Sequence, residues 1–188
     1  MELTQEKIDE LMDEMMRIAK TIRAGIPYSR TDGFPQAVVF LGPNLEPAST
    51  PITWRTEPEK YAKMRAVSKT AMDMFCQAVI LITDVRWVEN AKAEKMLGLP
   101  PLAEVGLEKW GEMYKREVTT RYGGYLGNAP AELYTEAIIA IMKGPKLNQI
   151  PMRTAPYQKG DRDSIHWLPS KNTSYGTLHF NLLPDWWC

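Results

Sequence analysis

The stretch QAVILITDVRWV, residues 77–88, decides the fold of this chain. It is rich in β-branched residues and apolar without interruption over 78–82, which is typical of a strand buried in a sheet. Because it is the most regular strand pattern in the sequence, we expect it at the centre of the sheet. Asp84 and Arg86 interrupt it, and the two-residue alternation of a strand places both on one face.

Two helices are predicted upstream of this strand. Over 4–24 the apolar residues recur at three- and four-residue intervals, which is the period of an amphipathic helix. A second helix is expected to begin near Thr56, whose hydroxyl can cap the first amides while Glu59 completes a capping box. Between the helices, residues 36–41 predict a short strand, and the prolines of 43–51 predict an irregular segment or a sheet edge.

Downstream of the central strand, the pattern predicts two helical fragments and then further strands. The helical fragments are Ala91 to Leu97 and Leu107 to Tyr114. The predicted strands are Lys115 to Tyr122, Tyr134 to Met142, Ile150 to Tyr157, Ser164 to Leu168 and Gly176 to Leu183. Period alone does not separate strand from helix over 134–142, and the length of that run before Gly144-Pro145 favours a strand.

This order of elements predicts the fold class. A helix, strands, a helix and then a succession of strands lack the regular alternation of a doubly wound sheet. We therefore expect an α+β fold, with a mostly antiparallel central sheet, an N-terminal amphipathic helix and a second long helix packed on it, both helices covering one face. A chain of 188 residues is expected to form a single globular domain over 1–188.

Composition limits the class of protein. Apolar residues make up 44% of the chain, and 23 basic residues balance 23 acidic ones, so bulk charge points to no polyanionic partner. Two cysteines are too few for a disulfide framework, and no apolar run approaches the roughly 18 residues that span a bilayer. The sequence therefore predicts a cytoplasmic protein with no membrane partner and no bound cofactor.

Polar residues on predicted strands are the first candidates for a catalytic site. Asp84 and Arg86 share a face of the central strand, and Glu117 and Arg121 share a face of the predicted strand 115–122. If those strands are neighbours, the four side chains form one polar patch. A solvated sheet face that carries an ion pair explains Asp84 and Arg86 equally well, and no nucleotide-binding or nucleophile-elbow motif accompanies them.

A cluster of acidic residues and histidine is the candidate metal site. Asp161, Asp163 and His166 lie within six residues and can in principle share a divalent ion, which makes a metal-assisted hydrolase one alternative. The composition of 159–163 is also that of a hairpin turn, whose carboxylates normally face water or cap their own backbone.

The C-terminal third carries a local basic excess, with six basic against two acidic residues over 143–179. Basic and aromatic side chains that alternate in this way can bind a single nucleic-acid strand through phosphate contacts and stacking. A nucleic-acid-binding module is therefore a second alternative, although aromatic pairs of an ordinary sheet explain the pattern too. Its candidate residues are Arg153, Tyr157, Lys159, Arg162, Trp167 and Lys171.

The leading hypothesis is a small non-catalytic protein that acts through protein contacts and associates with itself. Eleven methionines, several on the two helical stripes, suit an adaptable binding surface. Trp186 and Trp187 are costly to leave in water, so we expect at least one of them to be buried, on its own sheet or helix or in an oligomer interface.

Overall fold

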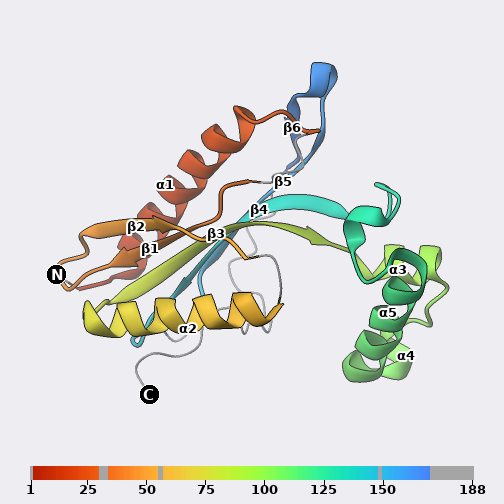
Figure 1. Ribbon diagram of the computed structural model, residues 1–188, viewed down its shortest axis with the longest axis horizontal. Coiled ribbons are helices and arrows are strands. Elements are labelled where there is room, and N and C mark those ends of the chain that lie inside the picture. The colour runs from red at the N-terminus through yellow and green to blue at the C-terminus, as the bar shows by residue number, and fades with distance from the viewer. Residues whose placement is uncertain (1, 30–33, 55–56, 148–149, 170–188) are drawn as a thin grey trace. The chain divides into compact units, whose positions relative to one another are not determined.

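The computed structural model describes residues 2–29, 34–54, 57–147 and 150–169 (Figure 1). Six strands form one sheet in the order β2-β1-β3-β4-β5-β6, and β1 pairs antiparallel with both β2 and β3, as β5 does with β6. The strands are β1 (Ala37–Leu41), β2 (Pro47–Pro51), β3 (Ala78–Trp87), β4 (Thr135–Lys143), β5 (Met152–Lys159) and β6 (Ile165–Trp167). The predicted α+β class and the central position of β3 are confirmed.

Both predicted long helices are present. The first, α1 (Gln5–Ala24), begins after Thr4, whose hydroxyl accepts a hydrogen bond from the amide of Lys7. The second, α2 (Glu57–Asp73), precedes β3. Thr56 of the predicted capping box and the predicted strand at 176–183 lie outside the described residues.

The two helices cover opposite faces of the sheet, as Figure 1 shows, so the prediction that both lie on one face is wrong. Alternation along β3 explains the arrangement. Ile80 and Ile82 pack in an apolar cluster with Met12 and Met16 of α1, which we call the cluster of α1. Val79 and Leu81 pack in a second apolar cluster with Met64 and Val67 of α2, which we call the cluster of α2. Because the central strands are apolar on both faces, each face needs its own cover.

Residues 85–137 form a second compact unit, distinct from the one made by the described residues of 1–84 and 138–169. It contains α3 (Asn90–Leu97), α4 (Leu102–Val105), α5 (Leu107–Tyr122) and the short 3-10 helix η1 (Leu126–Asn128). These helices enclose an apolar cluster of their own, which includes Leu97, Trp110 and Leu133.

The predicted strand Lys115 to Tyr122 is wrong, because these residues form the second half of α5. Trp110, Tyr114 and Val118 recur every four residues and all belong to the cluster of this unit, which is helical spacing. The Trp110 and Tyr114 rings stack with 5.5 Å between centroids. The alternation over Lys115 to Tyr122 spans too few residues to show this longer period.

The proline-rich segment was predicted to be either irregular or at a sheet edge, and β2 is an edge strand. The amide of Gly42 donates to Glu46 and the amide of Ile52 donates to Gln36, so alternate pairs of the β1–β2 ladder are hydrogen-bonded. This register leaves the main chain of Pro47, Ser49 and Pro51 directed away from β1. Proline has no N–H, so Ser49 supplies the one outward donor of β2 (Pro47–Pro51).

Candidate functional site

Asp84 is held by a buried tyrosine. The Tyr157 hydroxyl lies 2.9 and 2.8 Å from the two carboxylate oxygens of Asp84, and the Tyr157 side chain is 2% exposed. Burial, reinforced by the neighbouring carboxylate, raises the pKa of Tyr157, so the hydroxyl stays protonated and donates to Asp84. The Arg23 guanidinium lies 4.8 Å from the centroid of the same ring. The hydrogen bond from Tyr157 thus provides a partner for Asp84, the carboxylate within the apolar strand.

Arg86 is bound within the second unit. Its guanidinium donates to Glu136 at 2.9 Å and to the Tyr125 hydroxyl at 2.8 Å, and it lies 5.6 and 5.4 Å from the ring centroids of Tyr125 and Tyr134. Burial alone would lower the pKa of Arg86, but the hydrogen bonds from Arg86 to Tyr125 and Glu136 raise it overall. Sequence reasoning missed Glu136, although an acidic residue in a strand as apolar as 134–142 was a visible signal.

Glu117 and Arg121 lie on α5, so they do not extend a polar patch across the sheet as expected. They pair with each other four residues apart, with Arg121 Nε 3.1 Å from Glu117 Oε2. Arg121 also donates to the carbonyl oxygens of Met96 and Leu97 at 3.2 and 3.0 Å. The pair therefore satisfies the last carbonyls of α3, which is a structural task.

The predicted turn at 159–163 is confirmed as the connection between β5 and β6, and contains η2 (Asp161–Asp163). The Asp163 carboxylate accepts hydrogen bonds from the amide of Ser29, at 3.0 Å, and from the Ser29 hydroxyl. Asp161 and His166 are exposed. No group of three His, Cys, Asp or Glu side chains in the described parts of the chain is placed to hold a metal ion.

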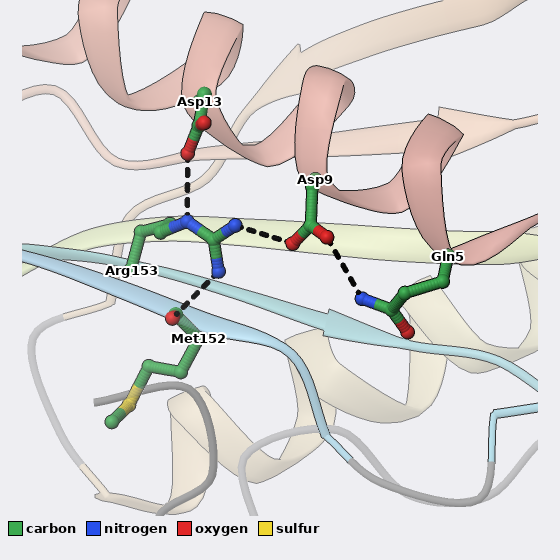
Figure 2. Close-up of polar contacts among 5 residues, drawn as sticks. All are labelled: Gln5, Asp9, Asp13, Met152 and Arg153. Atoms are coloured by element: carbon green, nitrogen blue, oxygen red, sulfur yellow. Dashed lines mark hydrogen bonds and ion pairs between the residues drawn. The ribbon is translucent and has the colours of Figure 1, made fainter. Parts of the chain in front are cut away.

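Arg153, a candidate nucleic-acid contact, is bound by α1 (Figure 2). Its guanidinium donates to Asp13 at 2.7 Å and to Asp9 at 2.6 Å, and its side chain is 11% exposed. The hydrogen bond from Arg153 lowers the pKa of Asp9. The two carboxylates therefore more than offset the single positive charge of Arg153.

The other candidate nucleic-acid contacts are placed as follows. The Tyr157 ring meets the Trp167 ring edge to face, 5.7 Å between centroids, and the Lys20 ammonium lies 4.9 Å from the Trp167 ring. Lys159 lies 3.9 Å from the Asp163 carboxylate. Arg162 is exposed in the turn. Lys171, like Trp186 and Trp187, lies outside the described residues.

Several of the large apolar side chains that are exposed among the described residues lie on α2 or in the turn after it. Phe75, in the turn after this helix, is 80% exposed, and Met72 is 55% exposed. Met74 and, at the other end of the helix, Tyr61 are exposed as well. Exposed apolar groups that gather on one element mark an interaction site more often than scattered ones do. The sequence pattern predicts that Tyr61, Met74 and Phe75 belong to the apolar stripe of this helix, and the exposure of all three shows that this part of the prediction is wrong.

The backbone at Phe75 adds a second, independent signal. The turns after α3 and α5 place Gly98 and Gly123 in the left-handed region, with φ of 70° and 65°, and the turn after α2 places Phe75 there, with φ of 53°. The amide of Cys76 donates to Ala71 as that of Leu99 donates to Glu94, so α2 and α3 end in the same way. Glycine adopts this conformation freely, whereas a residue with a Cβ is strained in it.

The exposed side of α2 carries both apolar and charged groups. Tyr61 and Met72 are eleven residues apart, about three turns, so they lie on one side of the helix. Arg65 and Lys69 are exposed between them, followed by Asp73. We call this set the α2 face, and it consists of Tyr61, Arg65, Lys69, Met72, Asp73 and Phe75.

Comparison with known families, with curated proteins and with solved structures finds no significant match to this chain. Among the helices within the described ranges, none combines the length and the apolar character needed to cross a bilayer.

Proposed function

We propose that this protein is a non-catalytic, self-associating protein, and that the α2 face is the surface through which two copies bind. The observation that carries the proposal is Phe75, a large apolar side chain that is 80% exposed while its backbone is held at a φ of 53°. Backbone strain at Phe75 lowers the stability of an isolated monomer, and the exposed ring contributes little to offset it. Burial of the ring by a second copy would offset the strain.

The spacing of the α2 face suits a pair of antiparallel helices related by a two-fold axis. Its aromatic groups stand at the two ends, Tyr61 at one and Phe75 at the other. An antiparallel partner therefore brings Tyr61 of each copy beside Phe75 of the other, and a two-fold axis repeats the contact.

The charges of the α2 face agree with this orientation. Arg65 is four residues from Tyr61, and Asp73 is two residues from Phe75. In the antiparallel alignment, Arg65 of one copy and Asp73 of the other are therefore offset by only about 3 Å along the helix axis. Lys69 falls near the two-fold axis, where two ammonium groups repel each other. The balance of 23 basic and 23 acidic residues leaves no net repulsion between copies.

One helix face is a small interface, so the association is expected to be weak, with Kd on the order of tens of micromolar.

A reducing compartment belongs to the proposal as well. Cys76 packs beneath α2 as a free, buried thiol, and burial raises its pKa, which keeps it protonated and unreactive.

Light scattering coupled to size exclusion, from about 10 to 500 μM, tests the proposal. The wild-type mass is expected to rise toward that of a dimer, and Phe75→Ser or Tyr61→Ser should hold it at the monomer value. Leu107→Ser is the matched control, because Leu107 is 68% exposed in the second unit. A wild-type chain that stays monomeric throughout, or a loss of association in the Leu107 variant alone, would exclude the α2 face.

Charge reversal tests the orientation separately. Arg65→Asp and Asp73→Arg should each weaken association, and the double variant should recover it, because the reversed pair is again complementary. If the double variant is weaker than either single one, the two residues do not meet across the axis.

A further inference from the structure

The face of the sheet that α2 covers has a second half, on β4 and β5. Ile138 and Ala140 of β4 and Ala155 of β5 pack with α1, so Ile139 and Ile141 point to the other side of the sheet. By the same alternation Met152 and Pro156 of β5 point there too. The cluster of α2, in contrast, draws its sheet residues from β1 and β3.

These four apolar residues are nevertheless shielded from water. Ile139, Ile141 and Met152 are 2%, 4% and 5% exposed, and Pro156 is buried. None of the three apolar clusters formed by the described residues includes them.

We infer that the C-terminal segment 170–188 of the same chain covers this half of the sheet. The segment follows β6, and β6 pairs with β5, so it begins beside the surface that needs a cover. Its 19 residues can reach about 60 Å when extended, against about 5 Å between neighbouring strands. Reach therefore does not limit the contact.

The composition of the segment matches an apolar surface. Lys171 and Asp185 are its only charged side chains. Its large apolar and aromatic residues are Tyr175, Leu178, Phe180, Leu182, Leu183, Trp186 and Trp187. The inferred contact gives Trp186 and Trp187 a place on their own sheet, separate from the α2 face.

A double-variant cycle in the full-length chain tests the contact. The double variant Trp186→Ala with Trp187→Ala is expected to lower the urea midpoint. Ile141→Val should lower the midpoint further, but by less in this double variant than in the wild type. Ile52→Val is the matched control: Ile52 packs in the cluster of α2, so its shift should be the same with and without the tryptophans. Equal shifts for Ile141→Val in both backgrounds would overturn the inference.

Amide hydrogen exchange gives an independent readout that does not depend on the variants being equally stable. In the tryptophan double variant, the amides of β4 and β5 should exchange faster than in the wild type. The amides of β1 should still exchange only through global unfolding, as they do in the wild type. If the effect of the tryptophans appears only at concentrations where the chain is dimeric, the segment covers a second copy instead, and the intramolecular assignment is wrong.

Discussion

Replacement of Phe75 by glycine is expected to leave the free energy of unfolding almost unchanged, although a whole aromatic side chain is removed. The left-handed conformation costs a residue with a Cβ about 1–2 kcal/mol, which glycine recovers. Glycine loses about 0.4–1 kcal/mol through the greater freedom of the unfolded chain. Phe75 is 80% exposed, so the ring buries only about 30–50 Å², which contributes about 1 kcal/mol. These contributions nearly cancel, and the net change is within about 1 kcal/mol.

The assay is urea unfolding at a protein concentration of about 1 μM, where the chain is expected to be monomeric. Phe40→Ala is the matched control, because Phe40 is 5% exposed in the cluster of α2 and its truncation should cost about 3–5 kcal/mol. The same Phe75→Gly variant should fail to associate at high concentration. A loss above about 2 kcal/mol for Phe75→Gly would show that the ring is part of the monomer's core and would refute the argument from exposure.

Three further predictions concern other features. Lys69→Ala should lower the Kd of self-association by about threefold to tenfold, because it removes like charges near the two-fold axis. Sedimentation equilibrium measures the Kd, and a weaker dimer would show that the two-fold axis does not pass near Lys69. Pro47→Thr with Pro51→Thr should produce large, concentration-dependent assemblies in dynamic light scattering, because two outward N–H groups are restored to the sheet edge, whereas Ser49→Ala should not. Tyr157→Phe should lower stability at pH 7 by about 1.5–3 kcal/mol through the lost bond to Asp84. In the wild type, stability should fall above about pH 10, because the folded chain retains the Tyr157 proton that the unfolded chain releases, and Tyr157→Phe should lose this part of the pH dependence.

Elements with a strong local signal were predictable from sequence. The first helix has both a cap at Thr4 and a full apolar stripe, and β3 has a run of apolar β-branched residues that a helix of the same length would not favour. The edge position of β2 followed from its prolines. Each of these features is decided within a few residues along the chain, which is what a sequence pattern records.

Features that depend on long-range packing were not predictable in the same way. The partners of Asp84 and Arg86 come from residues 73 and 50 positions away, so alternation located the two side chains without identifying what they bind. Phe75 was wrongly assigned to the apolar stripe of α2 for a different reason. A left-handed phenylalanine has no sequence signature, because glycine is the residue that marks such a turn. Its exposure becomes visible only once the helix and strand around it are placed.

The pairing of Arg153 with Asp9 and Asp13 has a consequence for how the chain is made. The residues it joins are 144 and 140 positions apart, so α1 cannot complete its docking until β5 has left the ribosome. At about 5–20 residues per second, synthesis of the intervening chain takes roughly 7–30 s. Throughout that interval Ile8, Met12 and Met16 lack part of their final cover. During this interval the nascent chain therefore carries a helix whose apolar face is incompletely covered, the type of segment that chaperones bind during translation.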